Sequence, residues 1–184
     1  MSGRLAVHSR AALPLLLAAL AMVGCGRPEP GQQPEAPLHV ERQDSVSVQL
    51  YFPGEDGRLY AERREIPAME DPEAQAEVLL RALLSGPESE LLQEIFPAEV
   101  RLETVLLRGD GIAYVDFQSS DALPPGVGST AEMQRLMSIV DSLSLNLSEV
   151  RRVVLLWNGA QLESFGGHLD TSRPVAPDTS LIAQ

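Results

Sequence analysis

The stretch LETVLLRGDGIAYVDF, residues 102–117, decides the fold class because it predicts a β-hairpin. Residues 102–107 and 112–117 are rich in the branched and aromatic side chains that are typical of strands. Between them, Asp110 and Gly111 supply a turn, because both residue types tolerate the positive φ that tight hairpin turns need. The sequence therefore predicts two antiparallel strands in the middle of the chain.

Two further hairpins are predicted on either side of this one. Residues 45–52 alternate between apolar and polar side chains, and the chain returns over residues 59–66 after a turn rich in Pro and Gly. Residues 153–157 are almost continuously apolar and are followed by an Asn-Gly pair, a strong turn signal, and a return strand over residues 161–165. The apolar strand 153–157 is expected to lie in the centre of the sheet.

Two main helices are expected between the hairpins. The first begins at Asp71, which can accept hydrogen bonds from the first amides, and stops at Ser-Gly-Pro, residues 85–87. A short helical piece is predicted over residues 91–96. The second main helix begins at residues 129–132, which match a capping box, and continues with apolar residues spaced by three or four positions. These apolar residues are Met133, Leu136, Met137, Val140, Leu143 and Leu147.

Together these elements predict the fold class α+β, with a single domain over residues 46–170. A mixed or antiparallel sheet of β-hairpins would pack against the two main helices, because each helix presents an apolar stripe. Residues 171–184 contain two prolines and end weakly apolar. They are expected to form a loose, Pro-containing tail.

The first 24 residues have the features of a bacterial export signal. Two arginines precede an apolar run over residues 11–23, which is shorter than the about 20 residues of a membrane-spanning helix. The run ends in MVGC, residues 22–25, which resembles a lipobox, although leucine is usual where Met22 stands. Residues 1–24 are therefore predicted to be a cleaved signal peptide, with a diacylglycerol attached to Cys25.

Residues 25–45 are predicted to be the lipidated cysteine and a Pro-rich linker that spaces the domain from the membrane. Acyl chains such as palmitate contribute about 0.8 kcal/mol per buried methylene, so two or three chains make a firm anchor. Gly26 is not the aspartate that retains lipoproteins at the inner membrane of enteric bacteria. We therefore expect a lipid-anchored protein on the periplasmic face of the cell membrane, with the outer membrane favoured in a diderm host.

The composition excludes several classes of partner and cofactor. Asp and Glu number 26 against 14 Lys and Arg, which gives a net charge of -12 and repels the phosphate backbone of nucleic acids. One cysteine forms neither an internal disulfide nor a thiolate cluster, and the 3 histidines do not form a zinc motif. A phosphate-binding loop of the Walker type needs a lysine, which this chain lacks. Neither a metal nor a cofactor is predicted.

Three residues of the domain are candidate binding or structural residues. Asp116 interrupts an otherwise apolar strand, Ser129 begins the second main helix, and His168 follows a pair of glycines after the last strand. The interpretation that we favour is structural. Asp116 would mark the strand end and bind a turn, and His168 would hydrogen-bond a backbone carbonyl and close the domain.

Two alternatives stay open at this point. A peptidoglycan hydrolase would need two carboxylates about 5 to 10 Å apart, and Asp116 with Glu132 is the pair that we would test. A small-ligand sensor would need a cavity lined by aromatic side chains, for which Tyr51, Tyr114 and Trp157 are candidates.

Five short motifs of the domain occur in a distinctive order: Val48–Phe52, Leu83–Pro87, Gly111–Phe117, Gly128–Glu132 and Gly167-His168. In this order they resemble the GerMN domain of the sporulation and spore germination protein GerM, over about residues 46–178. The resemblance implies an α+β module, regarded as non-catalytic, that serves cell-envelope assemblies and is often part of a lipoprotein. GerM carries two such domains, whereas this chain has room for one. The implied function is a binding or scaffold lipoprotein whose partner is an envelope protein or peptidoglycan.

Overall fold

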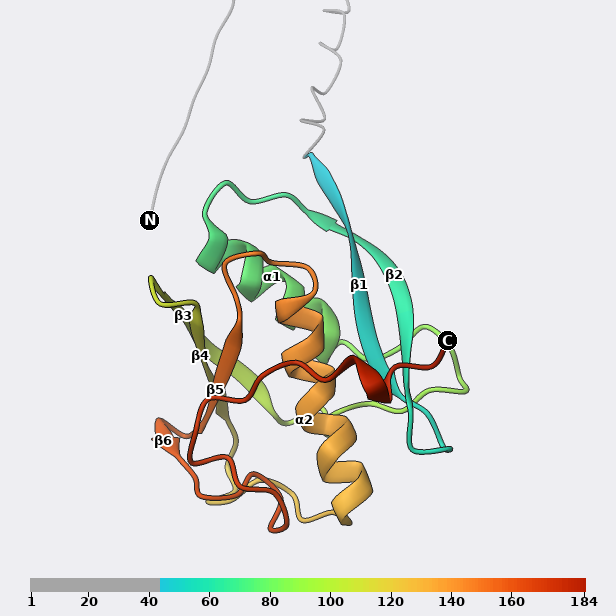
Figure 1. The fold of residues 1–184 in the computed structure, drawn as a ribbon, viewed down its shortest axis with the longest axis vertical. Helices are drawn as coiled ribbons and strands as arrows, with labels where there is room; N and C mark the ends of the chain where they lie inside the picture. The colour runs from blue at the N-terminus through green and yellow to red at the C-terminus, as the bar shows by residue number, and fades with distance from the viewer. Residues whose placement is uncertain (1–43) are drawn as a thin grey trace, which may run out of the picture. The chain divides into compact units, whose positions relative to one another are not determined.

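The structure, a computed structural model, describes residues 44–184 (Figure 1). The predicted signal peptide, Cys25 and nearly all of the linker lie outside these residues. Within them, no helix is long and apolar enough to cross a membrane. The elements are β1 (Ser45–Pro53), β2 (Leu59–Pro67), α1 (Pro72–Leu84), β3 (Arg101–Arg108), β4 (Ile112–Gln118), α2 (Ser129–Ser144), β5 (Arg152–Trp157), β6 (Ala160–Gln161) and the 3-10 helix η1 (Thr179–Leu181).

The strands form two sheets, so the prediction of one sheet was wrong while the α+β class is confirmed. β1 and β2 make an antiparallel hairpin, and the other strands make a sheet in the order β3-β4-β5-β6. β4 and β5 are parallel, whereas β3 and β6 run antiparallel to their neighbours. The parallel pair arises because α2 connects β4 to β5 and returns the chain to the same end of the sheet. β5 lies between β4 and β6, as the apolar pattern predicted.

The two α-helices pack between the β1-β2 hairpin and the four-stranded sheet (Figure 1). α1 begins as predicted, because the Asp71 carboxylate accepts a hydrogen bond from the Ala74 amide at 2.9 Å and Pro72 is the first helical residue. Its buried side chains include Leu79 and Leu83, and the helix contacts β3. The hairpin between β3 and β4 is also confirmed, with Gly111 at φ 85° in the turn.

α2 is buried on nearly every side, which an amphipathic pattern does not predict. The apolar residues Leu136, Val140 and Leu143 are buried as expected. However, polar side chains of the same helix are buried too: Glu132, Gln134, Arg135, Ser138, Asp141 and Ser142. A buried polar group is costly unless it is hydrogen-bonded, so each of these side chains needs a partner elsewhere in the fold.

Three polar side chains of α2 and the turn after it cover the outer edge of β1. Ser142 Oγ accepts a hydrogen bond from the Tyr51 amide at 3.0 Å, and the Ser138 hydroxyl donates to the Tyr51 carbonyl. Asn146 accepts from the Gln49 amide at 3.0 Å and donates to the Gln49 carbonyl at 2.7 Å. β1 therefore pairs with β2 on one side and with side chains on the other, which prevents it from joining a larger sheet.

Two more side chains of α2 hold loops. Arg135 donates from Nε to the Ile95 carbonyl at 2.8 Å and from Nη1 to the Pro125 carbonyl at 2.9 Å. Gln134 Nε2 donates to the Gly54 carbonyl at 2.8 Å, in the turn between β1 and β2. The helix thus orders several loops that are far apart in the sequence.

The predicted helical piece over residues 91–96 does not form. Leu92 makes an antiparallel bridge with Gly54, and the Gln93 amide donates to the Pro53 carbonyl at 2.9 Å. The segment runs along the end of β1, where the Pro53 carbonyl accepts a hydrogen bond from this segment. A single helical turn would be less stable, because the first turn of a helix is costly to nucleate.

The third hairpin is much shorter than predicted. Its turn forms, with Asn158 at φ 51° and Gly159 at φ 80°, but β6 spans only Ala160–Gln161. The expected strand 161–165 was therefore wrong beyond its first residue. Phe165 turns into the core, where its ring lies 5.8 Å from that of Trp157.

Residues 171–184 pack against both sheets, in contrast to the expected loose tail. Val175 exchanges backbone hydrogen bonds with Val153 at the start of β5, each at 2.8 Å. Further on, the Ala183 amide donates to the Leu59 carbonyl of β2 at 2.8 Å. Two open strand edges thus supply the partners that order this segment.

Candidate functional site

Ser129 is exposed as the first residue of α2, and the capping box predicted for it does not form. Gly128 is the N-cap residue, and within residues 44–184 no side chain caps the helix. The carboxylate of Glu132, which a capping box would turn back to the helix start, instead reaches a loop more than thirty residues further along the chain. The local prediction failed because that loop offers this carboxylate more hydrogen bonds than the helix terminus does.

Asp116 is buried and supports the turn after β5. Its Oδ1 accepts a hydrogen bond from the Gly159 amide at 3.0 Å. The turn belongs to the neighbouring strand, since Asp116 lies in β4 beside Leu156 of β5. This carboxylate therefore stabilises the left-handed pair Asn158-Gly159 from across the sheet.

Replacing Asp116 with alanine is expected to lower the free energy of unfolding by about 1–2 kcal/mol, because the Gly159 amide loses its acceptor. Urea unfolding followed by the fluorescence of Trp157 would measure the change. As a matched control, Asp121→Ala alters an exposed aspartate near the same end of the sheet and should change the free energy by less than about 0.5 kcal/mol. Equal stability of both variants would contradict this role of Asp116.

Glu132 anchors the loop that follows β6. One carboxylate oxygen accepts hydrogen bonds from the Ser164 hydroxyl at 3.0 Å, the Gly166 amide at 2.8 Å and the Leu169 amide at 3.2 Å. The other accepts from the His168 amide at 2.8 Å and lies 3.1 Å from His168 Nδ1. Its side chain is only 1% exposed, so these five contacts replace the water that a free carboxylate would bind.

The surroundings of Glu132 keep it ionised. Burial alone would raise the pKa of this carboxyl, but the hydrogen bonds from Leu169, His168 and Ser164 outweigh burial and hold the pKa below its usual value. A side chain at position 166 would meet the Glu132 carboxyl carbon at 2.8 Å, so glycine is required there. His168, 49% exposed at its side chain, faces this carboxylate rather than the expected backbone carbonyl.

The two carboxylates considered for hydrolysis thus hold backbone in different places. Asp116 binds the turn between β5 and β6, while Glu132 binds the loop from Ser164 to Leu169. A general acid or base must reach the proton that it transfers, whereas both oxygens of Glu132 already face donors from the protein. The aromatic residues considered for a small-ligand cavity are also separated, because Tyr51 lies in β1 while Tyr114 and Trp157 lie in the other sheet.

Asp141 is a buried carboxylate that nothing in the sequence pattern singles out, because it lies on an amphipathic helix among other polar residues. It is fully buried in α2, where Oδ1 accepts a hydrogen bond from the Asp178 amide at 3.0 Å and Oδ2 has no partner in the part of the chain that the structure describes. Burial raises the pKa of Asp141 to about 6, although the Asp178 amide opposes this shift. The carboxyl therefore holds the C-terminal segment and takes up a proton in mildly acidic solution.

The raised pKa predicts how stability depends on pH. Between about pH 4 and pH 6 the folded protein binds a proton at Asp141 that the unfolded chain has lost, so this group favours folding less as the pH rises. Asp141→Asn should remove this dependence, so that its stability relative to the wild type rises by up to about 3 kcal/mol between pH 4 and pH 7. Urea unfolding at several pH values would measure this, with the exposed Asp121→Asn as control. Parallel pH profiles for the wild type and Asp141→Asn would contradict it.

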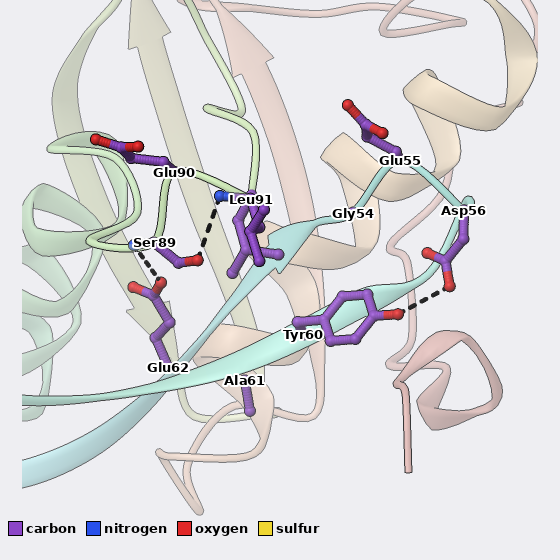
Figure 2. A pocket seen from close by; sticks show the side chains of 10 residues that line it. Gly54, Glu55, Asp56, Tyr60, Ala61, Glu62, Ser89, Glu90 and Leu91 are labelled. Atoms are coloured by element: carbon purple, nitrogen blue, oxygen red, sulfur yellow. Dashed lines mark hydrogen bonds between the residues drawn. The ribbon is translucent and has the colours of Figure 1, made fainter.

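A pocket with a volume of about 620 Å³ opens beside β2 (Figure 2). Its apolar wall includes the Tyr60 ring and Leu91, whose exposed fraction is 83%. Its rim is acidic and includes the exposed residues Glu55, Asp56 and Glu90. The Tyr60 hydroxyl donates to Asp56 at 2.8 Å, so the ring is held in place at the mouth of the pocket (Figure 2).

The far wall of the pocket is fixed by Glu62 of β2. Its two carboxylate oxygens accept hydrogen bonds from the Glu88 amide at 2.9 Å and the Ser89 amide at 3.0 Å. Arg64 contacts Glu62 at 2.7 Å. Glu62 is therefore occupied by the protein itself, as is Asp56, whereas Glu55 and Glu90 of the rim face solvent. No group of His, Cys, Asp and Glu residues with the geometry of a metal site occurs among residues 44–184.

The fold and these sites define an α+β module in which one buried polar helix holds the loops and an acidic pocket opens at the surface. The chain belongs to the Germane family, which is described as sporulation and spore germination, and residues 49–163 match it. The resemblance to the GerMN domain is thereby confirmed.

Solved structures share this fold. The first GerMN domain of the sporulation protein GerM from Bacillus subtilis is 22% identical, with a TM-score of 0.55 over 71% of this chain and 97% of that one. A Clostridium perfringens protein described as a lipoprotein is also 22% identical, with a TM-score of 0.53 over 76% of this chain and 93% of that one. The tandem GerMN domains of GerM give 21% identity and a TM-score of 0.51 over 73% of this chain and 46% of that one. No protein with a curated function matches the sequence significantly.

Proposed function

We propose that this chain is a lipid-anchored module of the bacterial cell envelope that binds another envelope component and performs no catalysis. The observation that carries the proposal is the match of residues 49–163 to a family described as sporulation and spore germination. The partner is an envelope protein or peptidoglycan, and nucleic acid is disfavoured by the net charge of -12.

The arrangement of carboxylates supports a role without catalysis. Glu132 and Asp116 accept hydrogen bonds from backbone amides of two separate segments, so neither is held ready for a substrate. The carboxylates that do face solvent, such as Glu55 and Glu90, border a pocket with an apolar wall. Such a combination suits binding, because apolar area provides affinity and the charges select the partner.

The membrane anchor is supported by the sequence and by one similar structure. The MVGC motif ends at Cys25, and a protein with the same fold is described as a lipoprotein. The anchored chain would lie on the periplasmic face, at the outer membrane in a diderm host, because Gly26 is not a retention signal.

Photo-crosslinking in living cells tests the proposal. A photoreactive amino acid placed at the exposed positions Leu91, Leu106 and Leu123 of the full chain samples different surfaces. Adducts of fixed size from the anchored chain, lost when Cys25→Ala removes the anchor, are the expected result. The absence of adducts at every position in several growth states would contradict a binding role. Release of fragments from purified peptidoglycan by the full chain would contradict the absence of catalysis.

A further inference from the structure

The outer edge of β2 presents backbone groups that point away from the protein. The Gly54 amide donates to the Arg58 carbonyl at 2.8 Å, and the same register pairs Phe52 with Tyr60. Along an antiparallel ladder, hydrogen-bonded residue pairs alternate with pairs that are not hydrogen-bonded. Because Arg58 belongs to a bonded pair, the backbone groups of the even-numbered residues of β2 bond to β1. The amides and carbonyls of the odd-numbered residues therefore face outward.

This edge is closed at its two ends and open in the middle. At one end the Leu59 carbonyl accepts from the Ala183 amide at 2.8 Å, and at the other the Pro67 carbonyl accepts from Gln75 Nε2 at 3.4 Å. Between them Ala61, Arg63 and Glu65 are exposed, and the described residues provide no hydrogen-bond partner for their backbone groups. The outer edge of β1, by contrast, is covered by side chains from α2 and Asn146.

An uncovered strand edge is a template for one more strand. The pocket described above lies beside this edge, since Tyr60 and Ala61 of β2 line it. Its apolar wall and the carboxylates of Glu55 and Glu90 match a long side chain with an apolar stem and a positive end. Lysine and arginine are the side chains of that kind.

We propose that an extended, basic segment of a partner protein adds a strand to β2 over Ala61–Glu65 and places a lysine or arginine side chain in the adjacent pocket. This inference rests on the proposed function as a binding module and names the chemistry of its partner. The net charge of -12 attracts a basic segment.

The same charges disfavour a second copy of this chain as the partner. Residues 62–65 are Glu, Arg, Arg and Glu. A two-fold antiparallel pairing centred on one of these residues places that residue opposite its own copy, so the central pair carries like charges, which is unfavourable. Centred on Arg63, however, the same pairing sets Glu62 opposite Arg64 of the other copy, which offsets part of this cost. Two copies would also repel each other through their net negative charge.

The test uses the full chain in a neutral detergent and a fluorescent nonapeptide of alternating valine and lysine. We expect saturable binding in fluorescence anisotropy, about tenfold tighter than that of the same peptide with glutamate in place of lysine. Two variants then separate backbone pairing from charge. Arg63→Pro removes an outward amide that β1 does not use and should weaken binding about tenfold, whereas Arg63→Ala keeps the amide and should change binding by less than about threefold.

Peptides with methylated amides keep the test decisive if Arg63→Pro fails to fold. Methylation on alternate residues blocks one edge of the peptide, so methylating one set should abolish binding and methylating the other set should leave it intact. Absence of saturable binding, equal effects of both methylated peptides, or dimerisation of the chain in sedimentation would overturn the inference. Crosslinked adducts from Leu123 without peptide binding would overturn it while leaving the proposed function in place.

Discussion

Replacing Glu132 with alanine is expected to lower the free energy of unfolding by about 3–5 kcal/mol. The variant leaves the Ser164 hydroxyl and the amides of Gly166, His168 and Leu169 without their acceptor. Each buried donor without a partner costs about 1–3 kcal/mol, and water reaches only part of this loop. Urea unfolding at pH 7, followed by the fluorescence of Trp157, would measure the loss.

Two further variants show whether the carboxylate is responsible. Glu132→Gln keeps the shape of the side chain but turns one acceptor into a donor that faces backbone amides, so it should lose at least about 2 kcal/mol. Glu149→Ala removes an exposed glutamate and should change the stability by less than about 0.5 kcal/mol. If Glu132→Ala were as stable as Glu149→Ala, the loop from Ser164 to Leu169 would not depend on this anchor.

The charge of Glu132 also predicts a dependence on pH. Because the folded state lowers the pKa of this carboxyl, its contribution is present at neutral pH and is lost as the pH falls through and below the ordinary value of 4.5. This direction is opposite to that expected for Asp141, whose raised pKa makes protonation favourable to the fold. As the pH falls through the acidic range, the stability of Glu132→Ala relative to the wild type should therefore rise, whereas that of Asp141→Asn should fall.

Replacing Cys25 with alanine is expected to remove the protein from the membrane fraction altogether. The MVGC motif provides the only cysteine of the chain, so the variant has no thiol to which a diacylglycerol can be attached. Two or three acyl chains hold a protein firmly, whereas the net charge of -12 repels anionic lipid. Cell fractionation and metabolic labelling with an alkyne-modified palmitate would show the loss of both membrane retention and acylation.

A matched change at the same motif serves as the control. Met22→Leu restores the residue that is usual three places before a lipobox cysteine, so this variant should be processed and retained at least as well as the wild type. Retention of Cys25→Ala in the membrane fraction would contradict the lipid anchor and would leave the binding role of the domain to be tested separately.

The features that the sequence predicted correctly depend on residues close together in the chain. The hairpin of residues 102–117 follows from two apolar runs around a turn whose Gly111 adopts positive φ. The start of α1 follows from the side chain of Asp71, which reaches an amide three residues further on. In both cases the interacting groups lie within one turn or one hairpin, so short-range rules suffice.

The features that the sequence did not predict depend on partners far away in the chain. Ser129–Glu132 matches a capping box, but the Glu132 carboxylate finds its donors at residues 164–169. The segment 91–96 has an apolar composition that suits a helix, but Gln93 pairs with Pro53 instead. A readable signal did exist for β1, because Ser138, Ser142 and Asn146 recur every four residues and form a polar stripe along α2 and the turn after it.

The sequence by itself determined the α+β class, the first two hairpins, the turn of the third, the start of α1 and the cysteine at which an anchor is predicted, because hydrophobic periodicity and turn chemistry act locally. Only the tertiary structure decided that the strands form two sheets, that α2 buries charged side chains and that residues 44–184 leave the middle of the β2 edge uncovered. A buried polar group must find a partner wherever the folded chain supplies one, and sequence distance does not limit that choice. The candidate binding surface beside β2 is therefore a property of the whole fold.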